Sequence, residues 1–184
     1  MKECCQTQRL FLKVLDERQG REVCEFYNRN REHFEPFEPE RTPGFYTVEF
    51  HKQTLAAERR QYEQKRYLRF YLYEKTQPEQ IIGSICYDNI RFGSFQSCTV
   101  GYKLDKEFQG KGYMQEALTY SLKEIIFGKY GLHRVEALVV PENTASVHVL
   151  ERLGFEREGI SHDFARLEGV WRDHVRYALV NYNG

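Results

Sequence analysis

The sequence has no long apolar run and no excess of charge of either sign. None of its 184 residues lies in a stretch that reaches the ~20 apolar residues of a membrane-spanning helix, and the polar segment Met1 to Leu10 lacks the apolar part of a signal peptide. Its 27 basic residues balance 27 acidic ones, so nothing favours a nucleic-acid-binding arm or an anionic-membrane anchor. These absences predict a soluble cytoplasmic protein that binds neither nucleic acid nor membrane.

Clustered metal ligands are also missing. The five cysteines have no metal-site spacing, and the six histidines form no HxxxH pair. An odd cysteine count in a chain without a secretion signal favours free thiols. Cys4-Cys5 could be prone to oxidation, although a frayed terminus without a role is the simpler interpretation. We expect no metal site.

Helix and strand patterns alternate along what we interpret as a single domain, residues 1–184, without repeats, low-complexity tracts or linkers. Strands are predicted at about residues 8–15, 67–74, 81–89, 96–104, 133–140, 155–161 and 170–180, with a turn at Gln77-Pro78. Helices are predicted at about residues 16–31, 47–66 and 113–126, with a short one after Asn143 that ends at Gly154. Three prolines between His33 and Tyr46 exclude regular structure there. The fold class is α/β (α+β) with a mixed sheet.

The first segment that carries chemistry is Thr99 to Ala117. A predicted strand ends near Leu104, a polar loop follows, and a strongly amphipathic helix begins at about Tyr113. The loop contains Gly110 and Gly112, which let backbone N–H groups converge on an anion at the positive end of the helix dipole. A pyrophosphate suits this place, and a tight turn without a ligand is the alternative. The pattern matches neither G-x-G-x-x-G nor GKS/GKT.

The second segment is Leu138 to Phe155. Taken alone, Asn143 is a helix N-cap and Ser146 a first-turn helix residue. The alternative is functional, because this helix start would lie beside a strand end where a cofactor tail could pass between two splayed strands. The segment alone leaves both interpretations open.

Together the two segments resemble the GNAT superfamily of acetyltransferases. The cofactor loop of that family reads Gln/Arg-x-x-Gly-x-Gly/Ala, and this chain has it at residues 109–114, with Met114 in place of the last small residue. The RimJ/RimL-like branch, which acetylates ribosomal-protein N-termini, reads GKGYM-x-EA, as residues 110–117 do here. The remaining matches to that branch are Gly101, Tyr102, Asn143, Ser146, Leu150, Gly154 and Phe155.

The resemblance implies a single GNAT-like domain. Its sheet would be mixed, mostly antiparallel and six- to seven-stranded, with helices on both faces and splayed central strands. It also implies acetyl-CoA as cosubstrate, bound by residues Tyr102, Leu104, Gln109, Gly110, Lys111, Gly112, Tyr113, Met114, Asn143 and Ser146. Backbone amides of residues 109–114 would hold the pyrophosphate, and Lys111 would support the phosphates or be a solvated loop lysine. The catalytic candidates are Ser146, as proton donor to the departing thiolate, and Asn143, as ligand of the pantetheine or of a bridging water.

No strong general base is evident from the sequence. Relatives carry a glutamate before the Gly-Tyr pair or in the last hairpin, where this chain has Thr99 and Ala165. Asp163 or Glu168 could take that role, or a water relay could, but each carboxylate can equally be a solvated loop residue. Deprotonation at pH 7 costs ~1 kcal/mol for an α-amine and ~4–5 kcal/mol for lysine, so an α-amine needs only a weak base.

The acceptor groove is expected from the 33–46 loop, the helix after it and the last hairpin. Its candidate lining is Phe34, Phe37, Phe45, Tyr46, Phe164 and Trp171, each of which can also be ordinary packing. Glu35, Glu38 and Glu40 could attract a cationic amine or form a solvated acidic loop. A homodimer is expected, with Tyr177 and Tyr182 in its interface.

The resemblance therefore implies an N-acetyltransferase that moves the acetyl group of acetyl-CoA to a primary amine. The expected acceptor is the N-terminal α-amine of a ribosomal-protein-like substrate, which attacks the thioester directly. Two alternatives stay open from the residues. One is an acetyltransferase for a small amine such as an amino sugar, polyamine or amino acid. The other is a non-catalytic acetyl-CoA-binding module.

Overall fold

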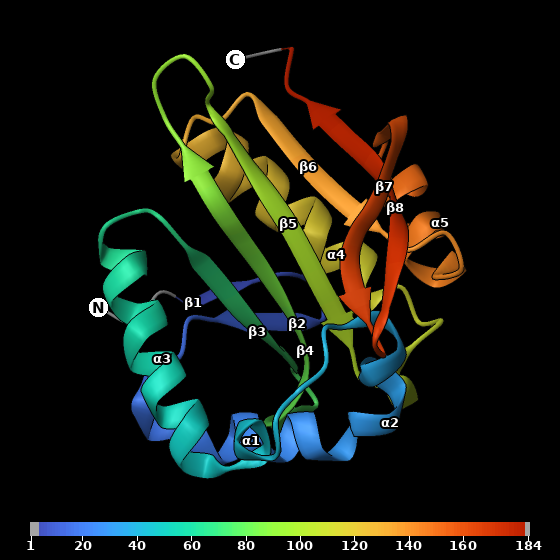
Figure 1. Ribbon diagram of the computed structural model, residues 1–184. Coiled ribbons are helices and arrows are strands. Elements are labelled where there is room, and N and C mark those ends of the chain that lie inside the picture. The colour runs from blue at the N-terminus through green and yellow to red at the C-terminus, as the bar shows by residue number, and fades with distance from the viewer. Residues whose placement is uncertain (1–3, 183–184) are drawn as a thin grey trace.

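The computed structural model describes residues 4–182 and is built on one eight-stranded sheet with strand order β1-β2-β3-β4-β5-β6-β8-β7 (Figure 1). The strands are β1 (Cys4–Gln6), β2 (Leu10–Lys13), β3 (Leu68–Glu74), β4 (Gln77–Arg91), β5 (Ser97–Leu104), β6 (Arg134–Val139), β7 (Glu156–Leu167) and β8 (Val170–Val180). Neighbouring strands are antiparallel except β5 and β6, which are parallel. The predicted mixed, mostly antiparallel sheet is confirmed.

The helices lie on both faces of this sheet, as expected. They are α1 (Gly20–Arg29), α2 (Arg31–Phe34), α3 (Val48–Glu63), α4 (Tyr113–Tyr120), which continues as the π-helix η5 (Ser121–Lys129), and α5 (Thr144–Arg152). Short 3-10 turns are η1 (Glu17–Gln19), η2 (Glu35–Phe37), η3 (Pro43–Tyr46) and η4 (Lys106–Phe108). α1 and α3 cover one face, and α4 lies behind the other (Figure 1).

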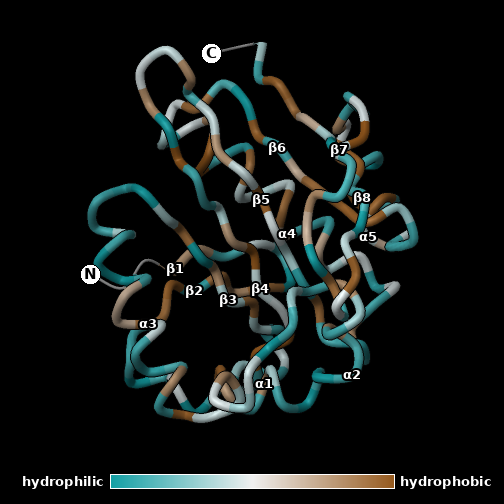
Figure 2. Tube along the Cα trace, in the orientation of Figure 1, coloured by the Kyte–Doolittle hydropathy of each residue, from teal (hydrophilic) through white to brown (hydrophobic). Residues whose placement is uncertain are grey.

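Alternation along the strands produces two separate hydrophobic cores. In β3, Phe70 packs with Ala117 and Leu118 of α4 on one face, whereas Tyr71 packs with Phe26 of α1 and Leu55 of α3 on the other. All of these side chains are at most 2% exposed, and burying each large one stabilises the fold by ~1.5–3 kcal/mol. Figure 2 shows the hydrophobic residues concentrated along the strands, with α3 largely hydrophilic.

The strand count and several boundaries differ from the sequence prediction. The sheet has eight strands among the described residues, not six to seven, because Cys4–Gln6 pairs with Phe11–Lys13 as an edge strand too short to show alternation. The turn before β4 lies at Lys75 and Thr76, so Gln77-Pro78 is part of the strand. β7 runs to Leu167 instead of ending at residue 161, since it pairs with β8 almost to the hairpin tip.

The helix predictions also need correction. The first helix begins at Gly20, because Asp16 caps the 3-10 turn η1. The predicted irregular segment 33–46 contains η2 and η3 and begins within α2, since proline is tolerated in the first turn of a helix. α3 ends at Glu63, short of residue 66.

The two parallel strands diverge. β5 pairs with β6 only at Ser97, Cys98 and Thr99, although β5 continues to Leu104 and β6 to Val139. The other edge of β5 stays paired with β4 from Thr99 to Leu104. The main-chain groups of residues 100–104 that face β6 are therefore open to a ligand, and the expected splay of the central strands is confirmed.

Candidate active site

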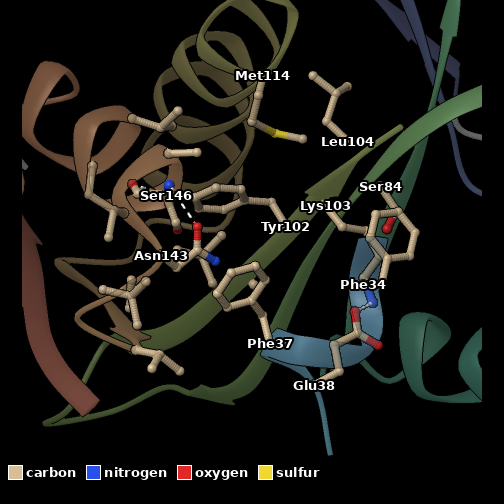
Figure 3. Close-up of a pocket in the computed structure, with 18 of the residues that line it drawn as sticks. Phe34, Phe37, Glu38, Ser84, Tyr102, Lys103, Leu104, Met114, Asn143 and Ser146 are labelled. Atoms are coloured by element: carbon tan, nitrogen blue, oxygen red, sulfur yellow. Dashed lines mark hydrogen bonds and ion pairs between the residues drawn. The ribbon is translucent and has the colours of Figure 1, made fainter. Parts of the chain in front are cut away.

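A cavity of about 840 Å³ occupies the space between the diverging strands. Residues 100–104 of β5 form one side, and residues 137–140 at the end of β6 form the opposite side. The loop before α4 and the first turn of α5 lie along the same cavity. Residues 34–39, which we call the η2 segment, close the cavity from the other direction (Figure 3). One continuous space therefore joins the two sequence motifs to the variable 33–46 segment.

The glycine loop has the conformation that anion binding requires. Gly110 and Gly112 adopt φ of +72° and +77°, a left-handed region that is costly for residues with a Cβ. Gly112 is the N-cap of α4 and contributes no capping side chain. The first-turn N–H groups of a helix have no intrahelical acceptor and lie at the positive end of its dipole. Both features favour a phosphate at this end of the cavity.

A brace from the N-terminal strands fixes this loop. Arg9 donates from Nη1 to the carbonyl of Lys111 at 2.9 Å, and its Nε pairs with Glu116 at 2.6 Å. Thr7 donates its hydroxyl to the same Glu116. Burial alone would raise the pKa of Glu116, but these hydrogen bonds outweigh it and lower the pKa. The sequence analysis missed this brace, because Arg9 and Glu116 are 107 positions apart.

The other end of the loop is fixed by Asp105, which is only 1% exposed. Its carboxylate accepts from Arg29 Nε at 2.8 Å and Asn30 Nδ2 at 3.0 Å, and it caps η4 through the N–H of Glu107 at 3.0 Å. Burial would raise the pKa of Asp105, yet these hydrogen bonds hold it below its ordinary value. The loop is thus anchored at both ends by ion pairs to distant segments.

Most of the predicted cofactor residues lie on the cavity. Its lining includes Tyr102, Leu104, Gln109, Gly110, Gly112, Tyr113, Met114, Asn143 and Ser146. Lys111 does not line the cavity. Its ammonium lies over the Phe108 ring, 4.9 Å from the ring centroid. Gln109 Nε2 lies 2.8 Å from His33 Nε2, which joins the loop to α2.

Two hydroxyl groups meet where α5 begins. Ser146 Oγ donates to the Tyr102 hydroxyl at 2.8 Å, and that hydroxyl donates to the Ser146 carbonyl at 3.0 Å. Asn143 Oδ1 accepts from the Ser146 N–H at 3.1 Å, which confirms the predicted N-cap. Figure 3 shows the Tyr102 ring beside Ser146, with Asn143 next to both. The tyrosine of β5 and the serine of α5 therefore form one hydrogen-bonded pair inside the cavity.

This hydroxyl pair stays protonated at neutral pH. Burial raises the pKa of Tyr102, and the hydrogen bond from Ser146 offsets only part of that effect. A protonated hydroxyl can donate to a developing negative charge, and Ser146 can supply its own proton or pass one through Tyr102. The pair is suited to assist departure of an anionic leaving group.

Lys103, the residue after Tyr102 in β5, holds the η2 segment in place. Its ammonium forms an ion pair with Glu38, and Arg41 donates to the same carboxylate at 2.8 Å. The ammonium also lies 4.9 Å from the Tyr27 ring centroid and 5.4 Å from that of Phe34. Burial would raise the pKa of Glu38, but the two cations outweigh it and lower the pKa. Glu38 is therefore an ionised partner of Lys103 and is not available to attract an amine.

The predicted acceptor groove is right only in part. Phe34 and Phe37 line the cavity (Figure 3), whereas Phe45 packs against Tyr27 and His51 inside the core. Tyr46 donates to Glu35, which also pairs with Arg31. Phe164 and Trp171 do not line the cavity, and no residue of α3 does. The remaining candidate, Glu40, is exposed on the loop.

The last hairpin does not bring its predicted carboxylates to the cavity. Asp163 and Glu168 are exposed, adopt φ of +47° and +48°, and do not line the cavity. From this hairpin only His174 reaches it. The carboxylates that do line the cavity are those of Glu38, Asp88 and Glu142.

Within residues 4–182, no helix has the length and apolar character to cross a membrane. No group of three or more histidine, cysteine or acidic side chains comes together in the same residues as a metal site would require.

The sequence and the fold are both similar to those of known acetyltransferases. The family described as "Acetyltransferase (GNAT) domain" matches residues 9–156. The chain is 34% identical to the ribosomal protein uS5-alanine N-acetyltransferase of Escherichia coli strain K12, over 94% of this chain and 88% of that protein. The structure of a ribosomal-protein-S5-alanine acetyltransferase from Vibrio fischeri matches with a TM-score of 0.93 at 30% identity, over 98% of both chains.

A second solved structure, Mycobacterium smegmatis RimJ in complex with CoA-disulfide, matches with a TM-score of 0.87 at 26% identity. The match covers 97% of this chain and 86% of that one. Since the family match spans most of the sequence and the fold recurs over nearly the whole length of these structures, the chain belongs to the GNAT family of acetyltransferases.

Proposed function

We propose that this acetyltransferase uses acetyl-CoA to acetylate the N-terminal α-amine of a ribosomal-protein-like substrate. The observation that carries the proposal is the cavity between β5 and β6, which runs from the glycine loop past the Tyr102–Ser146 pair to the η2 segment. The uS5-alanine specificity of the Escherichia coli relative and the CoA-disulfide bound to the RimJ structure support it.

The residues of this chain fit acetyl-CoA along that path. The N–H groups of residues 109–114 would hold the pyrophosphate at the start of α4. The open main-chain edge of residues 100–104 would pair with the amides of the pantetheine arm as an added strand does. Asn143 would contact the arm directly or through a water. The thioester would then lie beside the Tyr102–Ser146 pair.

The two proton transfers of the reaction need only modest assistance from the site. The N–C bond forms as the neutral amine attacks the acetyl carbonyl carbon, and the C–S bond breaks as the thiolate leaves. Free thiols have pKa ≈ 8.5, so one hydroxyl donor suffices for the thiolate. Ser146 would supply that proton directly, by turning its hydroxyl from Tyr102 to the thiolate, or through Tyr102, to which it donates. An α-amine is neutral in roughly a tenth of molecules at pH 7, so its activation is also modest.

The decisive experiment is an acceptor screen that measures thiol release from acetyl-CoA. Peptides with free Ala, Ser and Met N-termini are compared with amino sugars, polyamines and free amino acids. Peptides should give turnover with kcat/KM at least about tenfold above any small amine. Faster turnover of a small amine would identify a small-molecule acetyltransferase. Acetyl-CoA binding without thiol release for any acceptor would identify a non-catalytic module.

We also propose a cytoplasmic homodimer, although Tyr177 cannot serve its interface as predicted. Tyr177 is 4% exposed within the single chain because it packs in the core between sheet and helix, whereas Tyr182 is 83% exposed. A ribosomal-protein acceptor is met in the cytoplasm, which supports that location. Sedimentation should show a dimer, and a monomer at high micromolar concentration contradicts the proposal.

A further inference from the structure

The amine must lose protons in the cavity, so the groups able to accept them there decide how the reaction depends on pH. Glu38 is an ionised partner of Lys103 and Arg41. Glu142 is exposed and pairs with Arg172 at 2.9 Å. Asp88, at the end of the regular part of β4, takes part in no ion pair within the described chain and lines the same cavity. Asp88 is therefore the cavity carboxylate whose charge no cation neutralises by direct contact.

The register of the sheet places Asp88 next to an open patch of β5. Asp88 lies opposite Thr99, and Cys86, two residues back on the same face, lies opposite Gly101. A Cβ built on Gly101 would meet no atom within 4 Å. A glycine inside a strand often marks a close approach of a ligand. Here Gly101 leaves the main chain of β5 uncovered by a side chain, two residues after the pairing of β5 with β6 ends.

This patch is within reach of the Asp88 carboxylate. Diagonal cross-strand positions, such as Asp88 and Gly101, are separated by ~7–8 Å, which one carboxylate side chain and one water can bridge. The strand pairing becomes irregular directly after Asp88, where Asn89 adopts φ of +49°. Such bulges redirect side chains and are frequent beside active sites. Asn89 Nδ2 donates to Asp88 Oδ1 at 3.1 Å and fixes that side chain.

We propose that Asp88 accepts the proton of the acceptor amine through one water held over Gly101. The inference rests on the proposed function and names the base that the sequence did not reveal. One proton of the incoming ammonium passes to Asp88 and on to solvent. After the N–C bond forms, the departing thiolate takes up one proton from the Tyr102–Ser146 pair, and the second proton that leaves the nitrogen restores this proton to the pair through solvent. The sum is an amide, a thiol and one proton released.

The surroundings of Asp88 keep it basic without neutralising it. Burial raises the pKa of Asp88, while a hydrogen bond from Thr99 and the more distant charge of Arg69 on β3 reduce that rise. Arg69 is already paired with Glu58 of α3 at 3.1 Å. The other titratable groups near Asp88 on the neighbouring strands are the thiols of Cys86 and Cys98 and, on β6, Glu136 with its partner Arg134. A carboxylate more basic than usual is better matched to a base role near neutral pH.

The test is the pH profile of kcat/KM for the Asp88→Asn variant with the best peptide acceptor. At pH 7 we expect a loss of about 10- to 100-fold, at or below the low end for a general base, since an α-amine is partly neutral already. At pH 9.5 the amine is neutral unaided, and the variant should come within about threefold of the wild type. Acetyl-CoA affinity, measured by calorimetry, should not change.

Matched variants separate this role from a structural one. Glu142→Gln and His174→Gln remove the other titratable groups that reach the cavity from this end, and neither variant should show a loss that depends on pH. Asp88→Asn should not lower the melting temperature at pH 7, because a carboxyl whose folded-state pKa is raised disfavours folding once ionised. Asp88→Ser provides a second, smaller variant with the same expected profile.

A wild-type protein that acetylates no α-amine overturns the proposed function itself. An active wild type whose Asp88→Asn and Asp88→Ser variants keep its full profile overturns the proposal for Asp88 alone. The same holds if the loss of activity is equal at pH 7 and 9.5, or if His174→Gln and not Asp88→Asn shows the pH-dependent loss.

Discussion

The two sides of the cavity are built in different ways. On the side where we propose that the cofactor binds, the groups that face the cavity are main-chain groups, at the left-handed glycines before α4 and along the open edge of β5, and ion pairs brace the loop from behind. On the side proposed for the acceptor, the cavity is faced by side chains, such as Lys103 in its pair with Glu38, 65 positions apart. A pyrophosphate and a pantetheine arm are the same in every reaction of this cosubstrate, and main-chain groups suffice to hold them. Acceptors differ, and exchangeable side chains adapt to them.

The largest effect of a single substitution is expected at the glycine loop. Gly112→Asp forces a side chain into φ of +77° and adds a negative charge beside the phosphates. Strain of ~1–2 kcal/mol and charge repulsion together should weaken acetyl-CoA binding by about 100- to 1000-fold in calorimetry. Gly93→Asp, in the β4–β5 loop at φ of +68° with open space around its Cβ, is the matched control. If both variants bind acetyl-CoA like the wild type, the loop is only a turn.

On the acceptor side, Lys103→Met tests whether side-chain pairing holds the η2 segment. The half-buried Glu38 would lose one of its two cations and keep Arg41, which should lower the free energy of unfolding by about 1–3 kcal/mol at pH 7. Because the folded-state pKa of Glu38 is lowered, the pair stabilises the fold above the ordinary glutamate pKa and loses this effect as pH falls through the folded value. The deficit of the variant should therefore shrink toward pH 4.

Denaturant unfolding at pH 7 and pH 4 measures this prediction. Lys123→Met, which removes an exposed lysine of η5, should change stability by less than about 0.5 kcal/mol. A deficit of the Lys103→Met variant that is the same at both pH values would contradict the role of Glu38. The KM for the peptide should rise more than the KM for acetyl-CoA.

The hydroxyl pair lies where the two sides meet, and Ser146→Ala tests it. We expect kcat to fall by up to ~10²-fold with little change in acetyl-CoA affinity, because the hydroxyl acts on the leaving thiolate. Thr144→Ala removes another hydroxyl of the same helix and should leave kcat unchanged. If Ser146 and Tyr102 act as one unit, adding Tyr102→Phe to Ser146→Ala should cost little more than the worse single variant. If the Ser146→Ala variant keeps the full kcat while chemistry is rate-limiting, Ser146 has no part in the reaction and serves only as a residue of α5.

The smallest effect is expected at the N-cap of α5. Asn143→Ala removes the acceptor for the Ser146 N–H and should cost ~1 kcal/mol, a fall in melting temperature of about 2–4 °C. It should also weaken acetyl-CoA binding, since Asn143 lines the cavity. Thr47→Ala removes the comparable cap of α3, away from the site, and should cost stability alone. Equal acetyl-CoA affinity in both variants would reduce Asn143 to a cap.

The same contrast explains what the sequence could predict. Gly112, Asn143 and Gly154 act through their own backbone and the next few residues, so a local pattern was enough to place the helix start of α4 and both ends of α5. The strands β3, β4 and β5 were predicted from their local sequence for a similar reason. These features could be predicted because each depends only on residues that are close together in the sequence.

What the sequence did not predict depends on partners far along the chain. β1 has no pattern of its own and exists because β2 offers it an edge. Arg9 and Glu116 meet only once the sheet is formed. The register of the last hairpin carries the candidate bases Asp163 and Glu168 away from the cavity, and both are exposed, as in the alternative interpretation of solvated loop residues. Asp88 reaches it through a register that alternation alone does not fix.

We propose that acetyl-CoA bound between β5 and β6 serves an α-amine acceptor. One peptide that carries both a free N-terminal alanine and an internal lysine tests this proposal. The peptide is incubated with the enzyme and acetyl-CoA at pH 7 and analysed by fragmentation mass spectrometry. We expect a single acetyl group on the N-terminal nitrogen, because the lysine amine costs ~3–4 kcal/mol more to deprotonate. Acetylation of the lysine with the N-terminus left free would contradict it.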